Sequence, residues 1–160
     1  MKNEYKNTLE LKIRRHSANV KYTNFAHNVH HKAYHDVVVK QFGNWDEERQ
    51  DRYFSSDWKD GYGFEIIFYD GEPCGYCRFD YLPEYIIAHE LVISPDFQGN
   101  GIGTKILKEV IEYANVKNLP IKIGVLKENK ALNLYRKLGF KDVDESETHK
   151  GLKYLPNSGI

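Results

Sequence analysis

Apolar and polar residues alternate in several short stretches of this 160-residue chain, and such alternation predicts half-buried strands. The first stretch covers residues 8–15, where Leu9, Leu11 and Ile13 alternate with polar residues. Six further strands are predicted, over residues 63–69, 73–81, 84–94, 120–126, 140–144 and 148–155. The dipeptide Asp70-Gly71 is a turn signal, so the second and third strands are expected to form a hairpin.

Four segments predict helices, over residues 19–39, 46–55, 102–114 and 128–138. Asp46 can cap the start of the second helix, and Gly139 can end the last one. A run of strands followed by alternating helices and strands predicts an α/β fold, with a mixed sheet covered by helices. The chain contains neither an internal repeat nor a Pro/Ser-rich linker, so we expect a single domain over residues 1–160.

Composition narrows the class of protein. Hydrophobic residues make up 41% and charged residues 29% of the chain, which is typical of a soluble globular domain. The 23 Lys and Arg residues balance 23 Asp and Glu residues, which argues against a polybasic nucleic-acid-binding protein. No stretch approaches the roughly 18 apolar residues of a membrane span. The first residues lack an apolar signal core and only two cysteines occur, so a cytoplasmic protein is expected.

Charge is distributed unevenly along the chain. Residues 42–96 contain thirteen acids and four bases, a net charge of −9, whereas residues 101–141 contain nine bases and three acids, a net charge of +6. One interpretation is that the two segments suit partners of opposite sign, so that the acidic segment attracts a cationic substrate. The alternative is chance variation over a solvated surface.

A glycine-rich turn separates a predicted strand from a predicted helix, with the sequence Gln98-Gly99-Asn100-Gly101-Ile102-Gly103. Its glycines permit positive φ and close approach of the backbone to a ligand. The unpaired amides at the start of the following helix can bind a phosphate. The turn is not a P-loop, because a P-loop ends in Gly-Lys-Ser/Thr and here Lys105 comes after Thr104. It is not the dinucleotide-binding fingerprint either, because that motif needs glycine at position 104. A purely structural turn is the alternative.

With this turn the chain resembles the GNAT superfamily of acyl-CoA-dependent N-acetyltransferases. The family signature begins with Gln or Arg, followed by two residues of any type, Gly, one residue of any type, and Gly or Ala. Residues 98–103 match this signature and follow a strand that ends with Leu91-Val92-Ile93-Ser94-Pro95. The segment 128–140 looks like the Asn…Ala…Tyr…Gly-Phe helix of the family. The resemblance covers residues 85–141 well, the preceding hairpin is consistent with it, and residues 1–60 match only in the order of elements.

The resemblance implies a three-layer α/β fold, with a mostly antiparallel, splayed mixed sheet of about six to seven strands flanked by about four helices. It also implies acetyl-CoA as co-substrate, with the pantetheine arm between the fourth and fifth strands and the pyrophosphate on the glycine-rich turn. The residues that would bind the cofactor are Leu91, Val92, Ile93, Gln98, Gly99, Asn100, Gly101, Ile102, Gly103, Thr104, Asn129 and Tyr135.

Acetyl transfer to an amine needs a base for the amine proton, a backbone N–H for the oxyanion and an acid for the departing thiolate. Tyr135 matches the acid position of the family, and its alternative role is that of a packed core tyrosine. Glu90 and His89 are the candidate bases. Because adjacent strand residues point to opposite faces, at most one of them is expected to face the substrate. Two alternatives remain open: the amine could lose its proton through water, or Glu90 could be a solvated residue without a catalytic role.

Histidines recur every four residues at His27, His31 and His35, a stripe that could bind a metal, line the acceptor pocket or simply lie on the surface. The surface alternative is the simplest, so no metal is expected. Cys74 and Cys77 point to opposite faces of a strand and are read as ordinary strand residues. Trp45 could anchor the core or form a wall of the acceptor pocket.

The function predicted from these features is direct transfer of an acetyl group from the CoA thioester to a primary amine of a small molecule or protein. The alternative is a non-catalytic acyl-CoA-binding sensor or interaction domain of the same fold. Since the glycine-rich turn and the tyrosine are both present, the enzyme is favoured. Nucleic acid and membrane are not expected as partners, and an exposed C-terminal edge strand makes a homodimer plausible.

Overall fold

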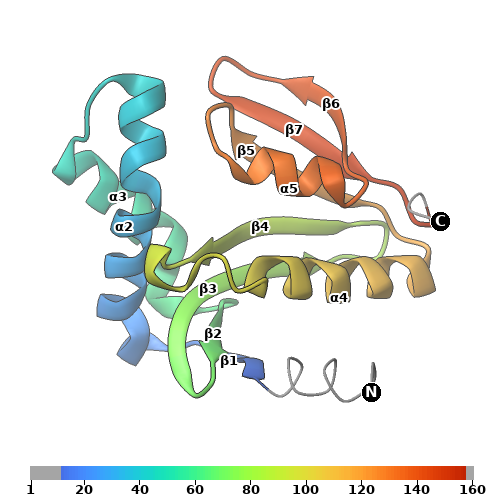
Figure 1. The fold of residues 1–160 in the computed structure, drawn as a ribbon, viewed down its shortest axis with the longest axis horizontal. Coiled ribbons are helices and arrows are strands. Elements are labelled where there is room, and N and C mark those ends of the chain that lie inside the picture. Colours follow the sequence, from blue (N-terminus) through green and yellow to red (C-terminus); the bar gives the residue numbers. More distant parts are fainter. Residues whose placement is uncertain (1–11, 158–160) are drawn as a thin grey trace. The chain divides into compact units, whose positions relative to one another are not determined.

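The computed structural model describes residues 12–157, in which the strands form one mixed sheet (Figure 1). Seven strands lie in the order β1-β2-β3-β4-β5-β7-β6. Their bounds are β1 Ile13–Ser17, β2 Glu65–Tyr69, β3 Glu72–Tyr81, β4 Ile86–Ile93, β5 Ile121–Leu126, β6 Lys141–Glu145 and β7 His149–Tyr154. β4 and β5 run parallel, with Ile86–Ala88 opposite Ile121–Ile123, whereas β1–β2, β2–β3, β5–β7 and β6–β7 are antiparallel.

Four α-helices lie within the described residues: α2 Thr23–Phe42, α3 Glu47–Trp58, α4 Ile102–Lys117 and α5 Ala131–Lys137. The predicted mixed α/β fold, with about seven strands and four helices, is therefore confirmed. None of these helices is both long and apolar enough to cross a membrane. The splay between β4 and β5 stays a prediction, and so does the part of the first predicted strand that falls in residues 8–11, outside the described residues.

Local sequence signals account for most of the element boundaries. The side chain of Asp46 accepts a hydrogen bond from the backbone N–H of Arg49, so it caps α3 as predicted. Asp70 and Gly71 have φ values of 50° and 83°, the conformation that a tight hairpin between β2 and β3 requires. α3 runs beyond the predicted end at residue 55, because Phe54 and Trp58, one turn apart, are both buried.

Contacts divide the chain into two compact units. The first unit contains residues 12–35, 45–78 and 90–102, and the second contains residues 36–44, 79–89 and 103–157. β3 and β4 each continue from one unit into the other. The expectation of a single domain over residues 1–160 stays a prediction.

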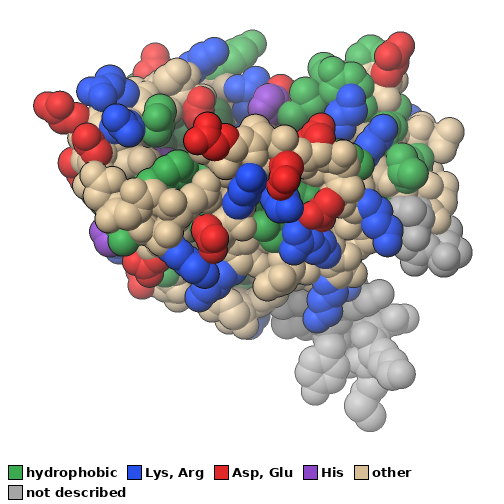
Figure 2. All heavy atoms as spheres, turned by 90° about the horizontal axis from the view of Figure 1, so that it is seen from above, with side chains coloured by type: hydrophobic (Ala, Val, Ile, Leu, Met, Phe, Trp, Pro, Cys, Tyr) green, Lys and Arg blue, Asp and Glu red, His purple; other side chains and the backbone are tan. Residues whose placement is uncertain are grey.

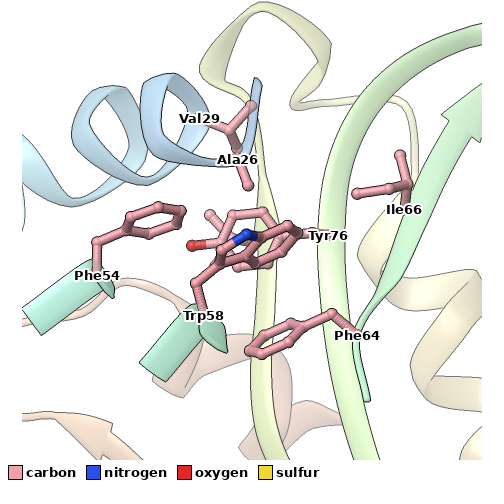
Figure 3. Packing of buried hydrophobic residues seen from close by; sticks show 8 residues of the cluster. Ala26, Val29, Phe54, Trp58, Phe64, Ile66 and Tyr76 are labelled. Atoms are coloured by element: carbon pink, nitrogen blue, oxygen red, sulfur yellow. The ribbon is translucent and has the colours of Figure 1, made fainter. Parts of the chain in front are cut away.

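The core of the first unit is an aromatic cluster centred on Trp58, which is 2% exposed. Its ring stacks at 5.7 Å from Phe54, lies 5.0 Å from Phe64, and meets Tyr76 edge-on at 5.7 Å. Figure 3 shows Trp58 lying against Tyr76 between the other two rings, below Ala26 and Val29 of α2. The indole N–H donates a hydrogen bond to Thr23, so the buried polar atom of Trp58 is satisfied.

The core of the second unit is aliphatic, with α4 supplying Ile106, Leu107 and Val110, each about 1% exposed. Beside α5, the ring of Phe140 lies 5.6 Å from Tyr135 and 5.6 Å from Tyr154. The backbone of Gly139, at φ 103°, ends α5 in the left-handed region, as predicted for this glycine. α5 is thereby fixed beside β7 (Figure 1).

Candidate functional site

A small pocket with about 10 Å³ of free volume lies within the first unit. The residues that line it are His30, Phe54, Asp57, Trp58, Phe64, Tyr76 and Glu90. Four of these are aromatic core residues, which makes the walls rigid and apolar. Two are carboxylates: Asp57 is exposed, whereas Glu90 is half-buried. The pocket therefore combines aromatic walls with two acidic groups.

Glu90 of β4 is the one lining residue that the sequence had singled out as a candidate base. Burial raises the pKa of its carboxyl group to about 7, and the negative charge of Asp57 acts in the same direction. The hydroxyl of Tyr34 donates a hydrogen bond of 2.8 Å to Glu90 Oε2 and partly offsets this shift. A carboxyl group that titrates near neutral pH can accept a proton there and release it again.

Two neutral side chains complete the polar wall. Burial, together with the neighbouring His31 and His27, lowers the pKa of His30 to about 4, so its imidazole is neutral at pH 7. Burial also raises the pKa of Tyr76 well above the ordinary value for a phenol, and the charge of Glu90 adds to the effect. Neither His30 nor Tyr76 carries a positive charge that could neutralise Asp57 and Glu90, so the pocket favours a cationic ligand.

His89, the other candidate base, lies outside this pocket. Its Nε2 atom is 2.7 Å from Asp80 Oδ2, and its side chain is exposed. Glu90, the next residue, lines the pocket instead. This difference follows from the alternation of side chains along a strand.

The glycine-rich turn leads directly into α4. Gly99 and Gly101 have φ values of 87° and 72°, and a Cβ atom built on either would meet no described atom within 4 Å. The side-chain amides of Gln98 and Asn100 donate to the carbonyls of Ile93 and Phe97, at 3.1 and 2.9 Å. The turn thus opens a sixteen-residue helix whose first turn contains no acidic residue, an arrangement suited to an anion.

The second predicted block belongs to the second unit. Asn129 Oδ1 accepts a hydrogen bond of 2.9 Å from the N–H of Ala131, the first residue of α5. Tyr135 of α5 is 4% exposed, with its ring edge-on to Phe140. These observations fit the core role that the sequence left open for Tyr135, and they leave its predicted catalytic role untested.

The structure adds residues that sequence reasoning did not select. Tyr34 gave no local signal, because its partner Glu90 is fifty-six residues away. Asp57 was one of thirteen acids in the segment 42–96, and only packing singles it out. Trp45 is not one of the residues lining the pocket. Instead its ring lies 5.1 Å from His31 and 5.3 Å from His35.

On the face drawn in Figure 2, Lys and Arg side chains are intermixed with Asp and Glu side chains. The uneven distribution of charge along the sequence therefore does not produce a patch of one sign on this face. The two carboxylates of the pocket are therefore a better guide to a ligand than the net charge of the segment around them.

Comparisons with known proteins show which family the chain resembles. The model of the Acetyltransferase (GNAT) family matches residues 30–140. An uncharacterised N-acetyltransferase of Methanocaldococcus jannaschii, MJ1207, is 35% identical over 102 residues, covering 58% of this chain and 44% of the relative. A thialysine N-ε-acetyltransferase of Bos taurus is 36% identical over 95 residues, covering 52% of this chain and 56% of the relative. The chain matches about half the length of these curated relatives.

Among solved structures, the PaiA N-acetyltransferase of Thermoplasma acidophilum in complex with coenzyme A superimposes with a TM-score of 0.73 at 15% identity. The superposition covers 89% of this chain and 98% of that protein. At this level of identity the likeness concerns the fold alone.

Proposed function

Because the chain belongs to the acetyltransferase (GNAT) family, we propose that it transfers an acetyl group from the thioester of acetyl-CoA directly to a primary amine. The observation that carries this proposal is Glu90, a carboxyl group with a pKa of about 7 in a small aromatic pocket. In the sequence it directly precedes the segment Leu91-Val92-Ile93 and the open glycine-rich turn. The end of β4 therefore connects the proposed proton acceptor, Glu90, to the turn proposed to bind an anion.

The cofactor would be held mainly by backbone groups. The first amides of α4 and the open turn at Gly99 and Gly101 suit the pyrophosphate of acetyl-CoA, since both glycines leave room for close approach. In this proposal the backbone of residues 91–93 binds the pantetheine and thioester, and residues 98–104 bind the phosphates. Asn129 and Tyr135 contribute from the second block, as the family resemblance implies.

The proposed reaction has three steps for the protein's own groups. The ionised carboxylate of Glu90 takes the proton of the incoming ammonium, directly or through one water, and thus frees the nitrogen lone pair. The N–C bond forms as the C–S bond breaks, and a backbone N–H of Val92 or Ile93 donates to the developing oxyanion. Tyr135 donates a proton or a hydrogen bond to the departing thiolate, and the second proton, which the nitrogen loses as the amide forms, returns to Tyr135 or passes through water to the thiolate. No covalent acyl-enzyme is needed.

The acceptor we propose is an aliphatic amine that is cationic in solution. Aromatic walls attract an ammonium group through their π faces, and the carboxylates of Asp57 and Glu90 attract its charge. The free volume of the pocket is only about 10 Å³, room for one water-sized group, so it suits the ammonium end of an amine and not a whole aminoalkyl arm. The name of the bovine relative, a thialysine N-ε-acetyltransferase, is consistent with such an acceptor.

A thiol-release assay with acetyl-CoA tests this function. The panel should contain polyamines, aminoglycosides, amino acids and peptides with free N-termini, each measured at low and high salt. We expect turnover to be fastest with flexible cationic amines and to slow as salt screens the carboxylates. Binding of CoA with no turnover across the panel would instead support the non-catalytic acyl-CoA-binding domain.

Two further expectations stay proposals. We propose a cytoplasmic location because the chain contains only two cysteines, and both are buried thiols. The homodimer would use β6, the strand at one edge of the sheet, whose five residues are all exposed. Lys, Asp and Glu fill most of that strand, so the pairing would require opposite charges to face each other across the edge.

A further inference from the structure

Two helices of the first unit face each other with matched pairs of metal-ligating side chains. α2 carries His27 and His31, and α3 carries Glu47 and Asp51. Each pair has a spacing of four residues, which places both side chains on one helix face. One ligand atom from each of the four residues lies within 4.8 Å of all the others. Figure 1 shows the two helices side by side.

The distances within this cluster are close to those of a tetrahedral metal site. Asp51 Oδ1 lies 2.7 Å from His27 Nε2 and 2.8 Å from His31 Nε2, and Glu47 Oε1 lies 3.3 Å from His31 Nε2. In a tetrahedral zinc site, bonds of about 2.0–2.2 Å hold the ligand atoms about 3.4 Å apart. The histidine nitrogens therefore need to move away from Asp51 by only about 0.6 Å to admit an ion.

Neighbouring groups hold the ligands in place. His31 Nδ1 lies 3.0 Å from His30 Nδ1, and the indole N–H of Trp45 donates to Glu47 Oε2 at 2.6 Å. The rings of His27 and His31 lie 4.0 Å apart, and Trp45 packs edge-on against His31. Support of this kind for the second ring nitrogen and the second carboxylate oxygen is usual around metal-binding residues.

We propose that His27, His31, Glu47 and Asp51 bind one divalent transition-metal ion, with Zn²⁺ the best match to two imidazoles and two carboxylates. Imidazole ligands disfavour Ca²⁺ and Mg²⁺, which prefer oxygen alone. The side chain of Glu47 is 62% exposed and that of His31 only 14%, so the site is open to solvent on one side and anchored on the other. This proposal replaces the sequence-based expectation of no metal.

An ion here would act on the acceptor pocket through His30. When the proton of His31 is on Nε2 and is donated to Asp51, Nδ1 of His31 is an acceptor for the Nδ1–H of His30. A metal on His31 Nε2 takes the place of that proton, and Nδ1 of His31 then carries hydrogen and donates to His30. The proton of His30 must then sit on its Nε2 atom. Since His30 lines the pocket, metal occupancy changes a hydrogen-bonding group of the pocket wall.

The test is a calorimetric titration of chelator-treated, dialysed protein with Zn²⁺. We expect one site per chain with micromolar or tighter affinity, and thermal stabilisation by Zn²⁺. Titration with Co²⁺ should give the intense visible absorption of a four-coordinate site. His31→Gln and Asp51→Asn should each weaken Zn²⁺ binding at least tenfold.

Matched controls lie on the same helices. His35→Gln removes an exposed histidine one turn beyond His31, and Glu48→Gln removes an exposed acid next to Glu47. Both should bind Zn²⁺ like the wild type. Asp51→Asn keeps the side-chain shape, so circular dichroism with chelator present should show an intact fold. Millimolar or weaker affinity in the wild type, or equal affinity in the wild type and the Asp51→Asn protein, would overturn the proposal and leave a hydrogen-bonded contact between helices.

Discussion

The hydroxyl of Tyr34, on α2, donates a hydrogen bond of 2.8 Å to the carboxyl group of Glu90, on β4. This bond stabilises the ionised form of Glu90 and lowers its pKa, whereas burial and Asp57 raise it. His30 and Tyr76, which also line the pocket, are both held neutral near pH 7. Tyr34 is therefore the uncharged group that keeps the carboxyl group of Glu90 titratable near neutral pH.

Removal of this donor should shift the pH dependence of the reaction. In the Tyr34→Phe protein the pKa of Glu90 should rise further, so the limb of kcat/KM that rises with pH should move upward by about one pH unit. The rate at pH 7 should then fall several-fold and recover above pH 8.5. Tyr53→Phe, at an exposed tyrosine of α3, is the control and should leave the profile unchanged. A uniform loss of rate at every pH would mean that Tyr34 acts only through packing.

Neutralising the proposed base should lower the rate more than any other change in the pocket. Glu90→Gln keeps the shape of the side chain and can still accept the hydrogen bond from Tyr34. We expect kcat to fall by about 10²–10⁴-fold near pH 7, with the dependence on the pKa of about 7 abolished. Steady-state kinetics across pH 5.5–9 measure both effects.

The neighbouring histidine provides the control for this change. His89→Gln alters a side chain that pairs with Asp80 outside the pocket, so its kinetics should match the wild type. The opposite result, a slow His89→Gln enzyme beside an active Glu90→Gln enzyme, would transfer the role of base to His89.

The same carboxyl group should make stability depend on pH. Its pKa is about 7 in the folded protein against 4.5 ordinarily, so between these values the folded state binds more protons than the unfolded state. Stability is then lost as pH rises through this window, by at most about 3 kcal/mol for this group. Glu90→Gln should therefore be more stable than the wild type at pH 8 and similar to it at pH 4.5. Urea unfolding at the two pH values measures the difference, and equal differences at both would contradict the raised pKa.

Cofactor affinity should depend on the absence of side chains in the glycine-rich turn. Gly99→Ala places a Cβ atom in the open space where the pyrophosphate is proposed to lie, so the KM for acetyl-CoA should rise at least tenfold. Gly43 has the same φ of 87° and equally open surroundings, so Gly43→Ala carries a similar backbone strain of about 1–3 kcal/mol. Both variants should lose similar stability in thermal unfolding. If they also bound acetyl-CoA alike, the turn would be structural only.

Local patterns were sufficient to predict the elements of this fold. Alternation, the Asp70-Gly71 turn, the Asp46 cap and Gly139 each act within a few residues, and the structure has all of them. The glycine-rich turn was recognisable for the same reason. What the sequence could not supply was pairing across long separations.

The carboxylates of α3 illustrate that limit. The histidine stripe of α2 was visible, but the sequence does not say that Asp51 of α3 lies within 2.8 Å of His31. Only the packing of the two helices brings them together, and that packing depends on the buried cluster around Trp58. The same holds for Asp57, whose position at the pocket follows from the register of α3 against the sheet.

Tyr135 provides the most demanding test of the proposed chemistry. It is 4% exposed and its ring packs edge-on against Phe140, so a role in the core is already evident. A phenol has a pKa near 10 and a thiol one near 8.5, so full proton transfer to the thiolate is uphill by roughly 2 kcal/mol in water. We therefore expect a hydrogen bond that strengthens as charge develops on sulfur. Tyr135→Phe keeps the ring and should lower kcat by about 10²-fold with little change in the KM for acetyl-CoA.

A second buried tyrosine of the same unit separates catalysis from packing. Tyr154 is 1% exposed and its hydroxyl donates to Asn115 Oδ1 at 2.9 Å, so Tyr154→Phe should cost about 1 kcal/mol of stability and leave kcat unchanged. Tyr135→Phe should slow the enzyme by far more than any loss of its stability accounts for. Because both changes delete one buried hydroxyl, a general effect of lost hydroxyls on folding would appear in both proteins. A well-folded Tyr135→Phe enzyme with the wild-type rate would remove Tyr135 from the mechanism and leave solvent as the proton source for the thiolate.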